Sequence, residues 1–393
     1  MSSGTSRRGK GRSGNQKKQG SPPLPLAREL FPELNATFYT ADPAAFLHLR
    51  IEMLSLMALS MADLAPVLAK HRRIGAVEFN PTGPPDDDQR QRYLVAEAQI
   101  VFHHAAEMIL RMFFAHVEAP DCPWLGMASS TSFVEFKHKV EATLKAGFDE
   151  ADIANVFLGG SDPIDAAIRV TDGEFADSVK AVRLLLGFCA DRLLTESFLY
   201  NAAKHGLTTV QLDESTKLSW GAKDKDRITI HTGPMLAYLH KPAAPNAPKE
   251  GPKWHISTTG PLPDQDLAVS TLVYRALRSL WSVAKRRYTA ESGELILFTH
   301  QDVETCIYGP IASSMNVVRT AVMELQKKKP DGSLTSIGIE FRGPQIPESW
   351  STRDVSNSPA KTVNLPVRQR DRRFSYDSSR ALLPFSPKGS SRV

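Results

Sequence analysis

Apolar positions recur every three to four residues over most of the first half of the chain, which is the period of a helix with one buried face. Asp42 stands before the first such run and Pro43 occupies its first turn, a typical helix start. Gly206 follows the last run, where a C-terminal glycine cap is expected. The pattern therefore predicts a helical bundle with helices over 43–71, 89–117, 132–146, 151–157 and 173–204.

Beyond Gly206 the period changes to short alternating runs separated by Gly- and Pro-rich turns, which indicates antiparallel strands. Helical periods return over 264–287 and 311–328. The chain is therefore expected to be an α+β protein, predominantly helical, in which the bundle precedes a small antiparallel sheet with helices. The strand-like runs lie over 208–220, 226–232, 235–241, 253–259, 294–299 and 335–341.

The net charge of +5 is unevenly distributed along the 393 residues. Residues 1–20 contribute +6 and residues 351–393 another +6, so the remainder carries −7. Both ends are rich in Gly, Ser, Lys and Arg and have too little apolar surface to offset the entropy of ordering. We therefore expect disordered basic tails over 1–25 and 346–393, a helical domain over 26–206 and an α+β region over 207–345.

The cysteines and the apolar segments indicate the compartment. Cys122, Cys189 and Cys306 lie far apart and form no Cys-x-x-Cys pair, so neither a disulfide framework nor a zinc knuckle is predicted. The charged N-terminus lacks the apolar core of a signal peptide. The apolar run 51–69 contains two acidic residues and a proline, which a membrane span rarely tolerates. The sequence therefore predicts a cytoplasmic protein with no membrane segment.

The basic tails suggest a class of partner. Clustered Lys and Arg attract RNA or another nucleic acid through its phosphates, without reading the base sequence. The same charges suit other acidic partners. The other interpretation is that the tails only keep the protein soluble.

The helix predicted over 89–117 contains polar side chains within its most apolar stretch. Glu107 lies four residues after His103 and four before Arg111, so the three side chains follow one helical face. Burying such groups is costly unless they are paired, which favours a Glu–Arg ion pair and hydrogen-bonded histidines inside a bundle. A di-iron bundle needs Glu-x-x-His on two helices, and no second helix repeats even the reversed order found here. No metal site and no cofactor are therefore predicted.

The same helix contains Arg111-Met-Phe-Phe-Ala-His116. This segment resembles the R-x(4–6)-H motif of HEPN-type helical domains, which occur in prokaryotic toxins and defence proteins. The resemblance concerns only the helical half, and it implies metal-independent RNA cleavage at the 2′-hydroxyl with Arg111 and His116 as catalytic residues. A histidine moves protons near neutral pH and an arginine stabilises charge on a phosphate, so the implied roles are chemically consistent. In that family the pair usually lies at a dimer interface, which implies a homodimer.

A second polar group ends the helix predicted over 173–204. Asn201, Lys204 and His205 fall at positions i, i+3 and i+4. This spacing is similar to segments of some HEPN-like abortive-infection proteins, which implies an auxiliary role in the same site. The other interpretation is structural, because Lys and His near a helix C-terminus stabilise the dipole.

The helix predicted over 264–287 has the one basic face inside the acidic middle of the chain. Arg275, Arg278, Lys285 and Arg286 are candidate contacts to nucleic-acid phosphates. The other interpretation is that they form the solvated side of an amphipathic helix.

Two functions from different classes follow from the sequence. The first is an HEPN-like protein that binds or cuts RNA. The second is a non-enzymatic interaction or regulatory protein, whose basic tails contact nucleic acid or other acidic partners. Aromatic side chains on predicted strands either stack bases or fill the interface between sheet and helices. These are Trp220, Tyr238, Trp254 and His255.

Overall fold

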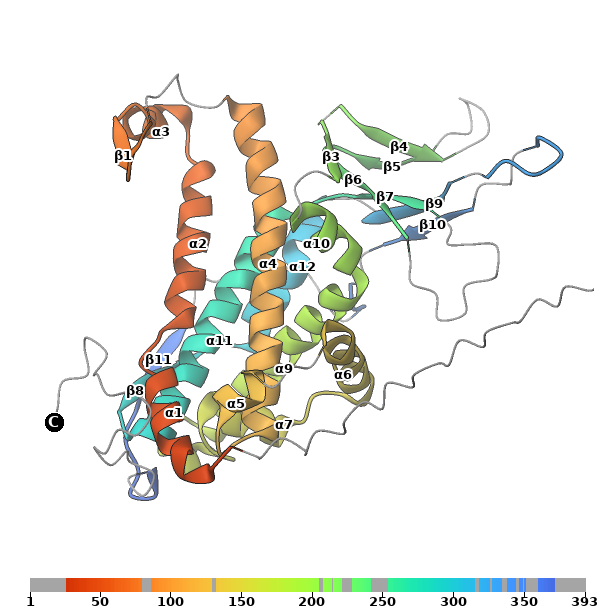
Figure 1. Cartoon of the computed structure of the whole chain (residues 1–393). Coiled ribbons are helices and arrows are strands. Elements are labelled where there is room, and N and C mark those ends of the chain that lie inside the picture. The colour runs from red at the N-terminus through yellow and green to blue at the C-terminus, as the bar shows by residue number, and fades with distance from the viewer. Residues whose placement is uncertain are drawn as a thin grey trace, which may run out of the picture.

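The computed structural model shows a helical body with an antiparallel sheet against one end of it (Figure 1). The predicted α+β class, with helices first and antiparallel strands interleaved with helices afterwards, is confirmed. The structure describes residues 26–79, 86–128, 132–204, 208–213, 215–220, 228–241, 254–314, 318–325, 327–333, 338–343, 346–348, 350 and 360–371.

Three long helices form the centre of the body: α4 (Asp87–Glu118), α9 (Asp172–Thr195) and α11 (Pro263–Thr289). α4 packs against both α9 and α11, and α2 (Pro43–Met57) runs beside α4 and α11 (Figure 1). The shorter helical elements are η1 (Arg28–Leu30), α1 (Phe31–Phe38), α3 (Met61–Leu68), α5 (Pro123–Ala128), α6 (Phe133–Ala146), α7 (Glu150–Ile153), η2 (Ala154–Leu158), α8 (Pro163–Ala166), α10 (Ser197–Lys204) and α12 (His300–Ser314).

Short polar side chains start the helices, because they accept hydrogen bonds from backbone N–H groups that have no partner within the helix. Asp42 accepts from the N–H of Ala45 at 3.0 Å, which confirms the predicted cap of α2. Ser132 and Glu135 form a reciprocal capping box at the start of α6. The predicted helix starts are therefore well placed at these two elements.

The main sheet has five antiparallel strands in the order β10–β9–β7–β6–β3. Directly paired positions run from Tyr238 through Ser257 and Val322 to Glu340, so these side chains share one face of the sheet. Its strands are β3 (Thr209–Leu212), β6 (Met235–His240), β7 (His255–Thr259), β9 (Thr320–Glu324) and β10 (Ile339–Arg342). Three smaller pairs are β1 (Arg72–Ile74) with β2 (Val77–Phe79), β4 (Lys217–Trp220) with β5 (Ile228–Thr232), and β8 (Gly293–Leu297) with β11 (Lys361–Leu365).

One hydrophobic core extends across the boundary predicted near Gly206. It includes Tyr39 and Leu110 from the N-terminal half, and Leu280 and Leu365 from the C-terminal half, all at most 1% exposed. α11 fills the centre of this core and packs on α4, although it lies beyond the boundary. The described residues on the two sides of position 206 therefore share one interior.

The single helix predicted over 43–71 is wrong. α2 ends at Met57, and Ser60 starts a separate helix by accepting a hydrogen bond from the N–H of Asp63 at 3.3 Å. A hairpin of β1 and β2 then occupies 72–79. The apolar run is continuous through this region, so the period alone does not reveal the break that the Ser60 cap creates.

The helix predicted over 311–328 is also wrong. Thr299 and Asp302 exchange backbone-to-side-chain hydrogen bonds that start α12 at His300, and β9 follows over 320–324. β9 lies between β7 and β10 and pairs with both, so sheet pairing overrides the helical period of this segment.

Part of the predicted C-terminal tail is folded onto the body. Within the segment 346–393, β11 pairs along its whole length with β8, and Leu365 is fully buried. Asp371 is only 3% exposed and accepts hydrogen bonds from Arg368. The prediction of a disordered tail is therefore corrected for residues 360–371, because an apolar side chain and a buried ion pair compensate the entropy of ordering.

Among the described residues, no single helix has both the length and the apolar content that crossing a bilayer requires. The helices over 28–57 and 61–68 meet that requirement only when they are joined across their 114° bend, and then by length and composition alone.

Candidate functional site

A cleft of about 2020 Å³ lies between the helical body and the main sheet. Its lining comes from α6, α7, α9, α10, α11 and α12 on the helical side and from β6, β7, β9 and β10 on the sheet side. This volume exceeds the roughly 300–1,000 Å³ of common small-molecule pockets. The cleft is therefore large enough for a ligand bigger than a typical metabolite.

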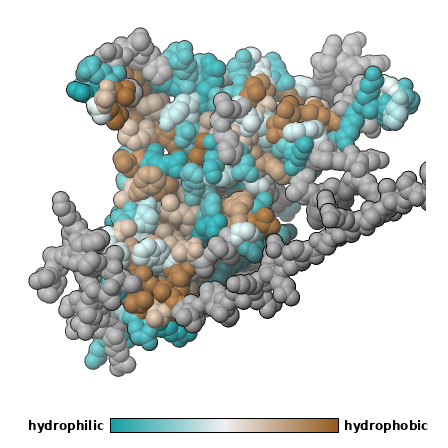
Figure 2. Space-filling model, viewed as in Figure 1, coloured by the Kyte–Doolittle hydropathy of each residue, from teal (hydrophilic) through white to brown (hydrophobic). Residues whose placement is uncertain are grey.

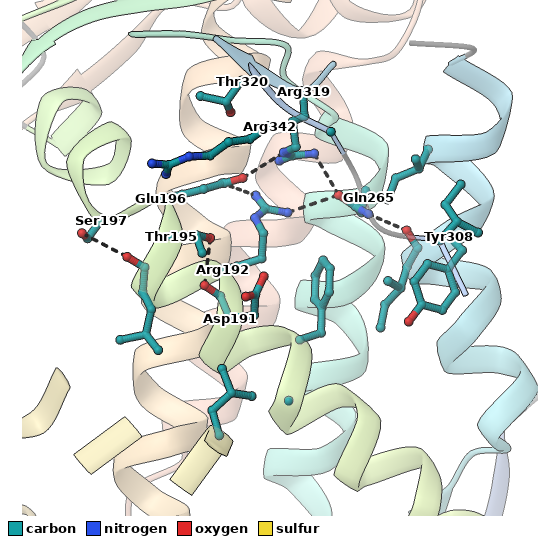
Figure 3. Close-up of a pocket in the computed structure, with 18 of the residues that line it drawn as sticks. Asp191, Arg192, Thr195, Glu196, Ser197, Gln265, Tyr308, Arg319, Thr320 and Arg342 are labelled. Carbon is teal, nitrogen blue, oxygen red and sulfur yellow. Dashed lines mark hydrogen bonds and ion pairs between the residues drawn. The ribbon is translucent and has the colours of Figure 1, made fainter. Parts of the chain in front are cut away.

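Two arginines and two carboxylates form a buried network at the floor of the cleft, and Figure 3 shows three of its members, Arg192, Glu196 and Arg319. Arg192 donates to Glu196 at 2.8 Å and to Asp266 at 2.9 Å. Arg319 donates from Nε to the other oxygen of Glu196 at 2.8 Å and from Nη1 to Gln265 at 3.2 Å. The four charged side chains are between 1% and 11% exposed. Each arginine is thereby fixed by at least two partners.

The end of α9 explains why this network forms here. Glu196 is the C-cap of α9. The partial negative charge at a helix C-terminus disfavours a carboxylate there, so neighbouring cations are needed to compensate it. Arg192 stands one turn earlier at the i, i+4 spacing of a helical ion pair, and its guanidinium also lies 4.5 Å above the ring of Phe102. Arg319 reaches Glu196 from the start of β9. The network therefore joins the helical body to the sheet.

The pKa values of the two carboxylates shift in opposite directions. Burial raises the pKa of Glu196, but the charges of Arg192 and Arg319 outweigh burial and hold the pKa at about 2. Burial also raises the pKa of Asp266, and here the two arginines compensate only in part. Glu196 is therefore ionised at every physiological pH and anchors both guanidinium groups.

α4 closes the network on the side away from the cleft. Gln99 donates to Glu196 at 3.1 Å, and Arg192 donates to the amide oxygen of Gln99 at 3.4 Å. One turn later, His103 stacks on Tyr200 with ring centroids 4.9 Å apart. Burial lowers the pKa of His103 to about 4, so the imidazole is neutral at pH 7.

A serine and a histidine are hydrogen-bonded on the sheet wall. His240 Nε2 lies 2.8 Å from Ser257 Oγ, and its ring stacks on Phe198 at 4.5 Å. A nucleophilic serine needs its histidine oriented by a third group, but Nδ1 of His240 has no partner among the described residues. Ser257 is also only 1% exposed, and burial lowers the pKa of His240 to about 4. We therefore interpret this pair as part of a polar wall.

Accessible cationic groups lie on both sides of the cleft. On the sheet, Arg342 pairs with Glu340 at 2.9 Å and its side chain is 51% exposed. The backbone N–H of Arg319 donates to the carbonyl of Arg342 at 2.9 Å, so the two arginines are neighbours on the sheet. On α6, Lys137 donates to Ser197 at 3.0 Å. These groups surround a cleft that is nearly neutral as a whole.

The near neutrality follows from the ionisable side chains in the lining. Six are basic and five are acidic, with His240, His255 and His300 in addition. The basic side chains are Lys137, Lys180, Arg183, Arg192, Arg319 and Arg342, and the acidic ones are Glu150, Asp191, Glu196, Glu340 and Glu348.

The predicted catalytic residues Arg111 and His116 do not meet. Arg111 pairs with Glu107 at 2.7 Å and lies 4.0 Å above the ring of Phe136 on α6. His116 contacts the hydroxyl of Tyr39 at 2.8 Å instead. Five positions on a helix turn the side chain by about 140°, so the two groups face different neighbours. The Glu–Arg ion pair, the alternative prediction for these residues, is present.

His116 is poorly suited to proton transfer in this conformation. It is 8% exposed, its Nδ1 lies 2.7 Å from the carbonyl of Met112, and burial lowers its pKa to about 4. It borders a separate cavity of about 190 Å³ together with Arg287 and Tyr288. Arg111 does not line that cavity, and neither residue lines the large cleft.

Two of the three predicted auxiliary residues, Asn201 and Lys204, do not line the cleft. Asn201 and Lys204 are exposed on α10, and the ammonium of Lys204 lies 5.7 Å from the ring of Tyr200. His205 lies outside the described residues. Among the described residues, no contact joins Asn201 or Lys204 to Arg111 or His116.

The basic face of α11 is only partly accessible. Arg278 is exposed, and Arg275 and Lys285 are partly exposed. Arg286 is fully buried and donates to the carbonyls of Ala166 at 2.6 Å and Gly159 at 2.7 Å. Its assignment as a phosphate contact is corrected, because a guanidinium without solvent exposure cannot reach a ligand on the surface.

The residues of the cleft were not among the predicted site residues. A local signal existed for Arg192 and Glu196, which interrupt an apolar helix at i, i+4, just as Glu107 and Arg111 do. No local signal existed for Gln265 or Arg319, because their partners are far away in the sequence: Arg192 for Gln265 and Glu196 for Arg319. Tyr238 and His255, considered as base-stacking candidates, do line the cleft.

Within the part of the chain that the structure describes, no three His, Cys, Asp or Glu side chains are arranged to hold a metal ion. The chain matches no protein-family model, and neither a similar curated protein nor a similar solved structure was found.

Proposed function

We propose that this protein binds a polar ligand with at least one anionic group in the cleft between the main sheet and the helices. One observation carries the proposal: Arg319 and Arg342 are neighbours on the sheet wall, and both side chains line the cleft. Arg319 is held rigidly by Glu196 and Gln265, whereas the guanidinium of Arg342 is half exposed. A fixed arginine beside an accessible one is a suitable receptor for a carboxylate or a phosphate.

The charge balance of the cleft favours one anionic group over many. Nearly equal numbers of acidic and basic side chains line it, and Arg342 and Arg183 are paired with the exposed carboxylates of Glu340 and Glu150. A nucleic-acid strand needs a run of unpaired positive charge, because its affinity comes mainly from phosphate neutralisation. A ligand with a single anionic group and additional polar groups fits this lining better.

The sheet wall beside Arg319 and Arg342 favours a binding function over a catalytic one. Tyr238, His240 and His255 present aromatic rings, and Ser257 presents a hydroxyl. Such rings provide apolar contact area while the hydroxyl and imidazole groups fix orientation. This agrees with the second hypothesis from the sequence, a non-enzymatic interaction protein.

The test compares charged and neutral probes on the purified full chain. Tripeptides with a free C-terminal carboxylate are compared with their amidated forms, and inorganic phosphate serves as a third probe. At 100 times the Kd a bound probe stabilises by about 2.7 kcal/mol, which thermal unfolding detects easily. We expect stabilisation by the anionic probes only, and its loss in Arg342→Ala.

The matched control is Arg278→Ala, which removes an exposed arginine on α11 outside the cleft lining. It should respond to the probes as the wild type does. Stabilisation that persists in Arg342→Ala, or that the amidated peptides share, contradicts an anion subsite at this position.

We propose RNA contact as a second function, and it concerns a different surface. Arg275, Arg278 and Lys285 lie on one side of α11, and at least part of each side chain is accessible. A gel shift with single-stranded RNA tests this surface. Charge reversal of the three residues should weaken binding and flatten its salt dependence. A shift that depends only on residues 1–25 and 372–393 assigns the contact to the tails instead.

A further inference from the structure

The α2–α3 connection, α3 and the β1–β2 hairpin project from one end of the body as an arm, defined here as residues 56–78 (Figure 1). Leu64 is the one buried residue of α3, and all residues of the hairpin that have a described side chain are exposed. A Cβ added at Gly75, in the turn of the hairpin, meets nothing within 4 Å. The hairpin therefore extends into open space.

Large apolar side chains are exposed on this arm (Figure 2). Ile74 is 70% exposed, Val77 is 58% and Val67 is 56%. Leu56 and Leu59, at the junction with α2, are 40% and 42% exposed. An isolated two-stranded hairpin is marginally stable in water, and a cluster of exposed apolar groups indicates an interaction surface.

The register of the hairpin places apolar and basic groups on the same face. Ile74 and Val77 are directly paired, so their side chains lie side by side next to the turn. Arg72 precedes Ile74 by two positions and therefore shares that face, further from the tip. An apolar tip with an arginine behind it matches the boundary between acyl chains and phosphate headgroups, where long basic side chains extend toward the phosphates.

The basic side chains of the arm indicate the partner, and with Asp63 and Glu78 at its two edges the arm carries a net charge of +1. Between positions 64 and 77 the chain contains Lys70, Arg72 and Arg73, with no acidic residue. All three are exposed, and none forms an ion pair with another described residue. Each basic side chain near an anionic leaflet strengthens binding by about fivefold. Glu78 stands directly opposite Arg73 in the hairpin, so Lys70 and Arg72 are the two cations of the arm without an acidic residue in register.

We infer that the arm docks on the surface of a bilayer that contains anionic lipids, with Ile74 and Val77 inserted among the acyl chains and Lys70, Arg72 and Arg73 at the headgroups. The contact is peripheral, because only the hairpin tip and the neighbouring face of α3 reach the bilayer. It is independent of ligand binding in the cleft.

Sedimentation of the full chain with vesicles tests this inference. Vesicles of phosphatidylcholine with one-third phosphatidylserine are compared with pure phosphatidylcholine. We expect binding to the anionic vesicles, a loss of about tenfold or more in Ile74→Ser/Val77→Ser, and a similar loss in Arg72→Glu/Arg73→Glu. Unchanged thermal unfolding of both variants verifies that the body remains folded.

The charge of the basic tails can by itself attract anionic vesicles. The test therefore needs a control variant that loses an exposed apolar side chain outside the arm. Ile164→Ser is the matched variant, because Ile164 is 91% exposed on α8 and lies outside the arm. It should bind vesicles as the wild type does. Binding that Ile74→Ser/Val77→Ser leaves intact assigns the attraction to the tails and overturns the inference. An absence of binding to anionic vesicles at low salt overturns it as well.

Discussion

The guanidinium of Arg319 donates to Glu196 at 2.8 Å, and this contact joins the start of β9 to the end of α9. Glu196 also holds Arg192, so one carboxylate anchors two buried cations. The sheet wall of the cleft is therefore positioned by a charge interaction whose partners are far apart in the chain.

Replacing Glu196 by Gln should destabilise the protein strongly. The amide has the shape of the carboxylate but no charge, which leaves Arg319 without an anionic partner and Arg192 with Asp266 alone. Breaking a buried ion pair from one side costs about 3–5 kcal/mol. Denaturant unfolding monitored by circular dichroism measures the change. Glu340→Gln, at the exposed pair with Arg342, should change the free energy of unfolding by at most about 1 kcal/mol. Equal effects of the two variants contradict the anchoring role of Glu196.

Stability should fall as the pH decreases below about 6.5. Burial lowers the pKa of both His103 and His116 to about 4, whereas in the unfolded chain histidine titrates near 6.5. The unfolded state therefore binds more protons between these values, and stability is fully present above pH 6.5. Each histidine should remove about 1.4 kcal/mol of unfolding free energy per pH unit between 6.5 and 4.

Guanidinium unfolding at pH 7, 6 and 5 measures this dependence. His116→Gln keeps a polar side chain but cannot titrate, so its slope between pH 6 and 5 should be shallower than that of the wild type by about 1.4 kcal/mol per pH unit. An unchanged slope shows that His116 is accessible to protons without unfolding.

The ribonuclease hypothesis has a direct test. RNA is incubated in EDTA with the wild type and with Arg111→Ala/His116→Ala at equal concentrations of folded protein. We expect no cleavage that depends on these two residues, because His116 is held between Tyr39 and the carbonyl of Met112 while Arg111 is paired with Glu107. Metal-independent cleavage that disappears in the double variant would establish the HEPN-like activity and require a different active conformation.

The C-terminal segment should contribute to the stability of the body. Asp371 lies 3.6 Å from the buried Arg286 and also accepts from Arg368. Burial raises the pKa of Asp371, but the hydrogen bonds from Arg368 outweigh it and the pKa is lowered. Asp371→Ala leaves Arg286 without a carboxylate and should cost about 3 kcal/mol. Arg370→Ala removes only an exposed pair with Asp165 and should cost less than about 1 kcal/mol in the same unfolding experiment.

Local features of the fold were predictable, and the cleft was not. The cap at Asp42 and the strand over 235–240 are encoded in adjacent residues, and the start of α2 and β6 both lie where they were predicted. The strand at 320–324 has a helical period, and only its two neighbours in the sheet determine its conformation. The cleft depends on contacts such as Arg319 with Glu196, which no local period can reveal.

The central position of α11 affects how the chain folds during synthesis. α4 and α9 leave the ribosome first, but the helix that covers their apolar faces begins only at Pro263. At about 5–20 residues per second, translation from the end of α4 to the end of α11 takes roughly ten to thirty seconds. During that interval the apolar surface of α4 has no native partner from α11. We therefore expect slower translation between α9 and α11 to increase aggregation of the nascent chain, because the apolar surface of α4 then stays uncovered for longer.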